Sequence, residues 1–216
     1  MKPIDTRILA GIQVPATPVI DRAMEYARLK CEPFLFNHVV RSWLFAVRLG
    51  QIQNIEHDAE VVAVGTLLHD ITLNKDFAGP RRFEVEGADL ARNFATDLGF
   101  DKRRAQLIWD SVALNSTASI ALHKEAEVAL STMGIGLDYG GFGFEALIPP
   151  AEMIEILRAF PRLEMKRNFA ETCRRLVSTR PETTSDNFLR DFGERLVPGY
   201  KPMSTVDLLM NGPFAE

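Results

Sequence analysis

The sequence has few of the residues that mark the more specialised protein classes. Only two of its 216 residues are cysteines, Cys31 and Cys173, and neither lies in a CxxC or Cys/His cluster, which argues against a disulfide framework or a thiolate zinc site. No stretch approaches the roughly 20 apolar residues of a membrane span, and the N-terminus lacks the basic-then-apolar layout of a signal peptide. We therefore expect a cytoplasmic protein with no membrane partner.

An excess of positive charge is also missing. The formal net charge is -4 and the pI is near 5.7, so the chain has no general attraction to nucleic acid or to anionic membranes. With 46% apolar and 25% charged residues, the composition is that of an ordinary globular protein. We expect a single domain spanning residues 1–216 and no nucleic-acid partner. Apolar helical segments such as 153–157 are compatible with a homo-oligomer.

Sustained alternation of apolar and polar residues is absent, whereas helical periodicity recurs along the whole chain. The run at residues 61–68 is apolar on nearly every side, which is typical of a buried central helix. We therefore expect an all-α fold, organised as one helical bundle. The predicted helices cover residues 17–30, 33–50, 58–72, 84–98, 102–114, 124–137, 151–159, 163–177 and 184–190.

Histidine is scarce as well, with four in the chain, and two of them belong to the most informative group of residues. His69 and Asp70 close the predicted buried helix, where the backbone can turn enough to aim both side chains at one ion. His38 lies within an upstream helix, and Asp138 precedes a glycine-rich turn. Each of these residues also has a simpler explanation when taken alone. The helix dipole favours a histidine at a helix C-terminus such as His69, His38 can be a hydrogen-bonded core histidine, and Asp138 can cap the turn. Together, two imidazoles and two carboxylates indicate metal chemistry.

The order of these residues resembles the HD superfamily of metal-dependent hydrolases. Five blocks are more closely similar to its cyanamide-hydratase-like branch, namely FNHVVRS (36–42), LLHDI (67–71), RFEVEGA (82–88), IWD (108–110) and EVAL (127–130). The resemblance covers approximately residues 30–145 and leaves a helical C-terminal extension at 150–210. It implies an HD-domain helical bundle in which His38, His69, Asp70 and Asp138 bind a divalent transition metal, Zn, Fe, Mn or Ni.

The small number of histidines also limits how many metals the site can hold. Members of the superfamily with two or more metals use additional histidines between the His-Asp pair and the last aspartate, and only His57 and His123 remain in this chain. His57 precedes the central helix and is expected on the surface. His123 alone cannot complete a second site, so the sequence favours one metal ion. Such an ion would activate water for attack on an electrophile.

Four further residues are candidates for the surroundings of the metal. Arg41, one turn after His38, could hold a phosphate or a carboxylate, and Lys75 on the following loop could admit an anion. Glu86 could accept a proton near the site. Ordinary surface ion pairs and solvated charges are the alternative for all three. Asn115 stands where cyanamide-hydratase-like sequences would have a histidine, and asparagine can hold a substrate amide but cannot accept a proton near neutral pH.

The expected function is therefore metal-dependent hydrolysis of a small molecule, with Asp70 serving both as ligand and as proton carrier. Arg41 favours a phosphoester substrate, and the cyanamide-hydratase-like blocks favour a small carbon–nitrogen compound. Two alternatives stay open: a cyanamide-hydratase-like lyase, and a non-catalytic HD scaffold with a structural metal or a ligand-sensing pocket. A helical nucleic-acid-binding module is disfavoured because the chain has no basic stripe.

Overall fold

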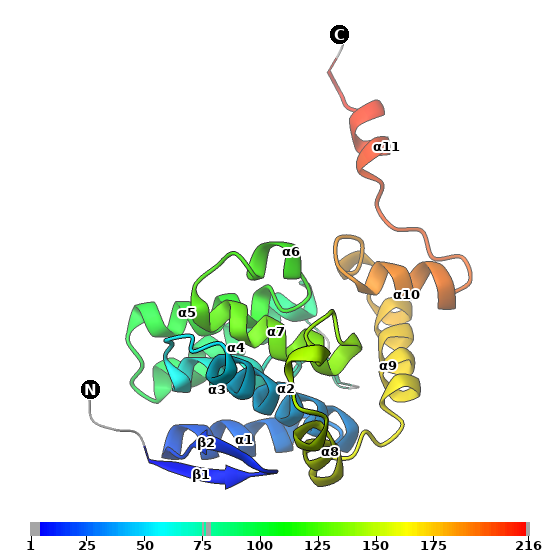
Figure 1. Cartoon of the computed structure of the whole chain (residues 1–216). Coiled ribbons are helices and arrows are strands. Elements are labelled where there is room, and N and C mark those ends of the chain that lie inside the picture. Colours follow the sequence, from blue (N-terminus) through cyan, green and yellow to red (C-terminus); the bar gives the residue numbers. More distant parts are fainter. Residues whose placement is uncertain (1–4, 75, 77–78, 215–216) are drawn as a thin grey trace.

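Helices account for most of the molecule (Figure 1). The structure is a computed structural model that describes residues 5–74, 76 and 79–214. Within these residues the only sheet has two strands, so the all-α prediction is confirmed, with one small addition at the N-terminus. In the same part of the chain, every helix is too short or too polar to cross a membrane.

The two strands form a hairpin that the sequence does not predict. β1 (Thr6–Leu9) pairs antiparallel with β2 (Ile12–Pro15). Ala10 and Gly11 join them with φ values of 49° and 78°, and positive values at both central positions are what a type I′ hairpin turn requires. Each strand has only four residues, which is too short for an alternating pattern to stand out. One face of β2 is buried, and β2 lies against the helix that follows Pro33.

Three helices form the centre of the molecule: α2 (Pro33–Ile52), α3 (Ala59–Leu67) and α7 (Ala126–Gly140). Residues 61–67 of α3 are all buried, as their apolar run predicts. The closest approach is between α2 and α7, where a Cβ atom added to Gly134 would collide with the backbone of Ser42. Glycine at this position therefore sets the spacing of the two helices that carry the functional side chains.

The remaining N-terminal helices surround this centre. α1 (Pro18–Lys30) begins at the predicted proline, and the Thr17 side chain caps it by accepting from the Ile20 N–H. α4 (Phe83–Asp97) and α5 (Lys102–Ala113) pack against each other, and α5 also packs on α3. The short α6 (Ala118–Ala121) follows α5 and contacts α7.

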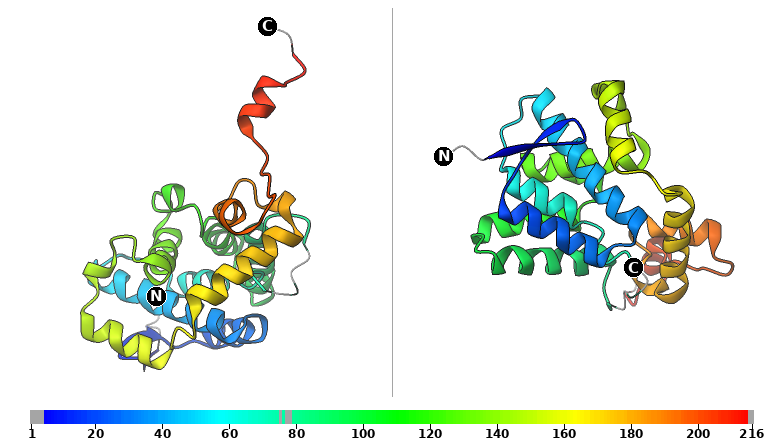
Figure 2. Two further views of the ribbon diagram at one scale, coloured as in Figure 1. Left: turned by 90° about the vertical axis from the view of Figure 1, so that its right-hand side faces the viewer. Right: turned by 90° about the horizontal axis from the view of Figure 1, so that it is seen from below.

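The C-terminal part folds around one side of the bundle, as both views in Figure 2 show. Its helices are α8 (Pro150–Ala159), α9 (Met165–Thr179), α10 (Leu189–Leu196) and α11 (Thr205–Met210), with 3₁₀ turns at Glu145–Leu147 and Pro181–Thr183. α9 packs against α2 and α10, whereas α11 stands clear of the rest of the molecule (Figure 1).

Two helices differ most from the sequence prediction, each for a local reason. The helix predicted at 184–190 is displaced, because the hydroxyls of Thr183 and Thr184 bond to carbonyls in a turn and the Asn187 side chain accepts from the Leu189 N–H at the start of α10. The helix predicted at 58–72 ends at Leu67. This early end decides the geometry of the functional site.

Candidate metal centre

The chain leaves helical geometry just before the His-Asp pair. Leu68 has a φ of -104° and a ψ of 5°, which ends α3, and His69 then turns back so that its Nδ1 lies 2.7 Å from the carbonyl oxygen of Thr66. The Thr72 hydroxyl donates to the carbonyl of Phe83 at 2.7 Å and ties the turn to α4. His69 and Asp70 can therefore face one point, which adjacent residues inside a helix could not do.

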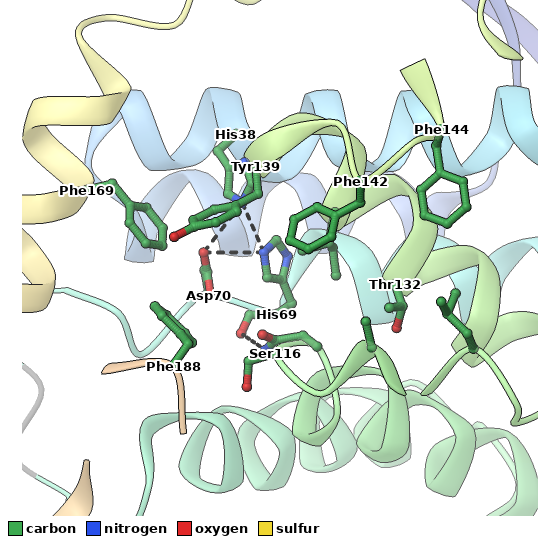
Figure 3. Close-up of a pocket in the computed structure, with 15 residues that line it drawn as sticks. His38, His69, Asp70, Ser116, Thr132, Tyr139, Phe142, Phe144, Phe169 and Phe188 are labelled. Carbon is green, nitrogen blue, oxygen red and sulfur yellow. Dashed lines mark hydrogen bonds and ion pairs between the residues drawn. The ribbon is translucent and has the colours of Figure 1, made fainter. Parts of the chain in front are cut away.

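His38 of α2 completes a group of three (Figure 3). The Nε2 atoms of His38 and His69 are 3.2 Å apart. Oδ2 of Asp70 lies 3.7 Å from Nε2 of His38 and 3.3 Å from Nε2 of His69. All three side chains are buried. Three residues separated by up to 32 positions in the sequence thus direct one ligand atom each at the same point.

The hydrogen bonds on the far side of each ring determine what the near side offers. Nδ1 of His69 faces a carbonyl oxygen and Nδ1 of His38 faces Oδ2 of Asp138 at 2.6 Å, and because both partners accept hydrogen bonds, each Nδ1 carries the proton. A neutral imidazole with its proton on Nδ1 has a lone pair on Nε2. The lone pairs of His38, His69 and the Asp70 carboxylate therefore converge, and this arrangement requires a positive charge between them.

The pKa values of the three side chains reflect the same requirement. Burial lowers the pKa of His38 and outweighs the opposing effects of Asp138 and Asp70. Burial would lower the pKa of His69 too, but the charge and hydrogen bond of Asp70 outweigh it and raise that pKa. Burial acts to raise the pKa of Asp70, and the neighbouring histidines nevertheless lower it. The raised pKa of His69 and the lowered pKa of Asp70 both reflect the attraction between the imidazole and the carboxylate.

The spacing of the three ligand atoms fits a transition metal. Two ligands that are each about 2.1 Å from an ion lie about 3.0–3.7 Å apart for angles of roughly 90–125° at the ion, and the observed separations are 3.2, 3.3 and 3.7 Å. Two imidazoles with one carboxylate suit Zn, Fe, Mn or Ni. Three protein ligands would leave coordination positions for water or substrate, as in catalytic sites and unlike closed structural sites.

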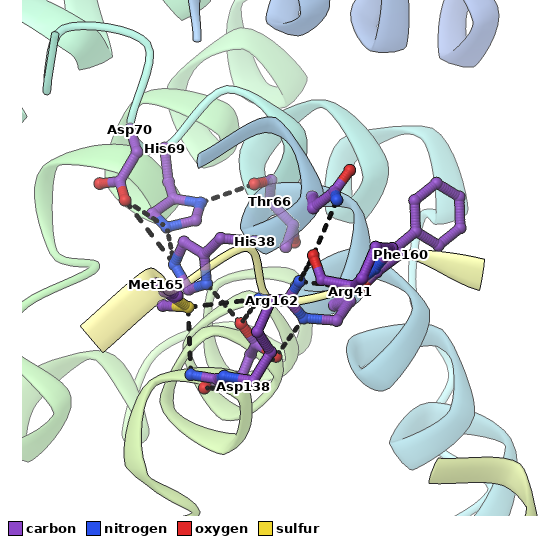
Figure 4. A network of polar contacts seen from close by, with 11 residues as sticks. His38, Arg41, Thr66, His69, Asp70, Asp138, Phe160, Arg162 and Met165 are labelled. Atoms are coloured by element: carbon purple, nitrogen blue, oxygen red, sulfur yellow. Dashed lines mark hydrogen bonds and ion pairs between the residues drawn. The ribbon is translucent and has the colours of Figure 1, made fainter. Parts of the chain in front are cut away.

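Asp138, expected to be the fourth ligand, lies behind His38 in the structure (Figure 4). Its Oδ2 accepts from Nδ1 of His38 and from Nη2 of Arg41 at 2.7 Å, and its Oδ1 accepts from Nε of Arg41 at 2.7 Å and Nη1 of Arg162 at 3.3 Å. Four donors fill the lone pairs of the carboxylate. Burial opposes ionisation, but His38 and Arg41 hold the pKa of Asp138 far below its usual range. The structure thus groups three candidate ligands and places Asp138 as the partner of one.

A cavity of about 210 Å³ opens above the three ligand atoms. Five aromatic side chains wall it, namely Tyr139, Phe142, Phe144, Phe169 and Phe188. Its polar lining comes from the three candidate ligands and from Asn115, Ser116 and Thr132. Among the described residues that line it, none is a lysine or an arginine. An apolar cavity of about 150 Å³ holds benzene, so this one accommodates a small, mainly uncharged molecule.

Of the other predicted site residues, one lines the cavity and two lie outside its described lining. Asn115 lines the cavity, and its Nδ2 donates to the carbonyls of Val112 at 2.8 Å and His69 at 3.4 Å. Arg41 is fully buried against Asp138 and is not part of the described lining. Glu86 pairs with Arg81 at 3.1 Å near the start of α4 and is also outside that lining. Lys75 lies outside the described residues.

Several residues of the site carry no signal in the sequence. Arg162, Phe169 and Phe188 come from the C-terminal extension, more than 20 positions after Asp138, and nothing in their local patterns indicates the cavity. Tyr139 is the exception, because it directly follows Asp138. An aromatic residue beside a candidate ligand could have been assigned to the same site.

Comparison with known protein families gives a match for the N-terminal and central part of the chain. Residues 35–135 match the model of the HD domain, a stretch that includes all three residues whose ligand atoms converge. No curated protein matches the chain. The similarity to the cyanamide-hydratase-like branch is therefore not established by these comparisons. The HD-domain match over residues 35–135 and the buried His38-His69-Asp70 cluster support membership of the HD superfamily of metal-dependent hydrolases.

Proposed function

We propose that the protein is a metal-dependent hydrolase or hydratase that acts on a small, uncharged molecule with a carbon–nitrogen electrophile. The observation that carries this proposal is the composition of the cavity, whose described walls are aromatic and without a cationic side chain. A phosphoester carries charge that such a wall leaves uncompensated. A neutral compound of the size of a substituted benzene matches both the volume and the polarity.

The contacts of Arg41 support the proposal of an uncharged substrate. The sequence allows Arg41 to hold a phosphate or a carboxylate, but both edges of its guanidinium are engaged, with Asp138 on one side and the carbonyl oxygen of Phe160 at 2.9 Å on the other. Releasing it would leave Asp138 buried without its main partner, which is costly. Arg41 is therefore proposed as a positioning residue, which fixes Asp138 and through it the ring of His38.

Each side chain of the site is then proposed to have its own role in the reaction. When bound, the metal ion supplies Lewis acidity and lowers the pKa of water at its open positions. His38 and His69 would hold the ion through Nε2, and Asp70 would hold it through one oxygen and accept the proton of the attacking water. As the water oxygen adds to the electrophilic carbon, the carbon–nitrogen π bond breaks, and the proton passes from Asp70 to the substrate nitrogen. The aromatic wall keeps bulk water away from this step.

Phosphoester hydrolysis is the second candidate, because most HD-domain proteins are metal-dependent phosphohydrolases and the match covers residues 35–135. A phosphate would then have to be neutralised by the ion itself or by the loop that contains Lys75. The two candidates share the metal centre and differ in the charge of the substrate. Substrate charge is therefore the property to test.

The deciding assay compares metal-loaded protein on neutral aryl amides and aryl nitriles and on p-nitrophenyl phosphate. The proposal predicts turnover of a neutral carbon–nitrogen substrate that is lost in Asp70→Asn and kept in His57→Ala, since the His57 ring bonds to the Ile55 carbonyl away from the cavity. Turnover of the phosphoester alone would support the second candidate. Metal binding with no turnover of either class would indicate the scaffold alternative.

A further inference from the structure

The cavity has a polar side formed by Asn115, Ser116 and Thr132, which we call the polar floor. Asn115 and Ser116 follow the end of α5, and Thr132 belongs to α7. Figure 3 shows Ser116 below His69, whereas Tyr139 lies above it. A ligand at the metal centre is therefore held between an aromatic wall and this floor. Its polar groups must match the hydrogen-bonding capacity of the floor.

Asn115 offers the cavity an acceptor. Both contacts of its Nδ2 are to carbonyl oxygens, those of Val112 and His69, and a carbonyl oxygen cannot donate. The NH₂ group must therefore face these two carbonyls, which use both of its hydrogens. The remaining polar atom of the side chain, Oδ1, is the one left for a ligand.

Ser116 offers an acceptor for a different reason. Its hydroxyl donates to Oε1 of Glu84 at 2.7 Å. Glu84 is fully buried, is paired with Arg82 at 2.9 Å and accepts from Nδ2 of Asn187 at 3.2 Å. A carboxylate in an ion pair accepts hydrogen bonds and donates none. The single hydrogen of Ser116 is thus committed to Glu84, and only lone pairs of its oxygen are available to the cavity.

Thr132 adds independent evidence that a ligand belongs here. Its side chain is only 3% exposed, and its Oγ1 has no hydrogen-bond partner among the described residues. Buried hydroxyls are normally paired, so an unpaired one beside a cavity indicates a partner that binds from the cavity. The hydroxyl can rotate to donate or accept, and it therefore does not restrict the ligand as the other two residues do.

We infer that the polar floor makes the enzyme selective for substrates that present an uncharged N–H group, such as that of an amide, to Asn115 Oδ1 and Ser116 Oγ. This inference rests on the proposed function and specifies its substrate class. An N–H donor can form hydrogen bonds with the two acceptor atoms, Asn115 Oδ1 and Ser116 Oγ. A methyl group of the same size leaves them unpaired, and a carboxylate places its own lone pairs against them.

Binding of two ligands of similar shape tests the inference without relying on turnover. Benzamide presents an NH₂ group, and acetophenone replaces it with CH₃. Isothermal titration of the metal-loaded protein is expected to show benzamide binding about tenfold more tightly than acetophenone. In Ser116→Ala and in Asn115→Leu, the advantage of benzamide over acetophenone should fall to about threefold or less.

Ser178→Ala is the matched control, because the Ser178 hydroxyl bonds to the Arg174 carbonyl on the exposed side of α9; it should keep the full tenfold preference. Equal affinities for benzamide and acetophenone in the unmodified protein would overturn the inference and leave the proposed function standing. No binding of either neutral ligand would overturn both. A preference for benzamide that survives in both floor variants would also overturn the inference, since two separate residues would then have been assigned wrongly.

Discussion

The imidazole rings of His38 and His69 face each other with their Nε2 atoms 3.2 Å apart, while the Nδ1–H of each ring is held by an oxygen elsewhere. Two histidines in this arrangement cannot share a hydrogen bond unless one of them is protonated. Together with Oδ2 of Asp70 they form a buried group that is short of positive charge. This relationship is the reason to regard the site as a metal centre.

Removing one of the facing rings should remove the metal. His69→Ala deletes a ligand atom and leaves two, so we expect the affinity for Zn²⁺ to fall by more than about 100-fold, beyond the 10–100-fold that loss of an indirect partner costs. Competition with a fluorescent chelator measures this directly. His57→Ala should bind as tightly as the unmodified protein, and an equal loss in both variants would contradict the assignment of His69.

Asp138 should act on the metal indirectly, through His38. In Asp138→Asn the carboxamide is neutral, so the Nδ1–H of His38 loses a charged acceptor and the ring becomes a weaker ligand. We predict a loss of about 10–100-fold in metal affinity with the fold retained. Glu152→Gln is the control, since Glu152 forms a comparable ion pair with Arg48 at 2.6 Å but outside the site. Complete loss of binding in Asp138→Asn would indicate that Asp138 is itself a ligand.

The pair of Arg41 and Asp138 should matter for stability as well. Both side chains are at most 1% exposed, so Arg41→Met leaves a buried carboxylate without its main partner and is expected to cost about 3–5 kcal/mol of unfolding free energy in urea titrations. Arg41→Met/Asp138→Leu should recover part of this loss, because the unpaired charge is gone. The pair of Arg48 and Glu152 is more exposed, so Arg48→Met is expected to lower the unfolding free energy by less than about 1 kcal/mol. A double variant less stable than Arg41→Met would contradict this account.

The distance between α2 and α7 should depend on a single glycine. Gly134→Ala introduces a methyl group that collides with the backbone of Ser42, and we expect a loss of about 2 kcal/mol or more, with weaker metal binding because His38 and Asp138 lie on these two helices. Gly136→Ala on the same helix meets only the Phe142 ring at 3.4 Å. It should be neutral or slightly stabilising, since alanine favours the helix. Thermal unfolding of both variants gives the comparison.

The parts of this structure that the sequence predicts are those decided locally. The apolar run of α3 indicates a buried helix, and its end at His69-Asp70 indicates where two side chains can turn toward one point. The helix that carries His38 begins, as predicted, at Pro33. These features depend on neighbouring residues and on helical periodicity alone.

The parts that escape prediction depend on contacts between distant segments. Asp138 becomes the partner of His38 because Arg41 and Arg162 occupy its oxygens, and Arg162 lies in a segment with no resemblance to guide its placement. Phe169 and Phe188 complete the aromatic wall from the same C-terminal region. Burial of Arg41 likewise follows from the packing of α7 and residues 160–165 around it, which no local pattern in α2 reveals.

The metal content of the protein tests the central claim most directly. Protein purified without added metal should carry close to one equivalent of a divalent transition metal by elemental analysis. After removal by a chelator it should take up one equivalent again, and the variant with both His38→Ala and His69→Ala should take up none. A folded, metal-free protein with no measurable affinity for Zn, Fe, Mn or Ni would contradict the account, because the converging lone pairs of His38, His69 and Asp70 would then have no ion to bind.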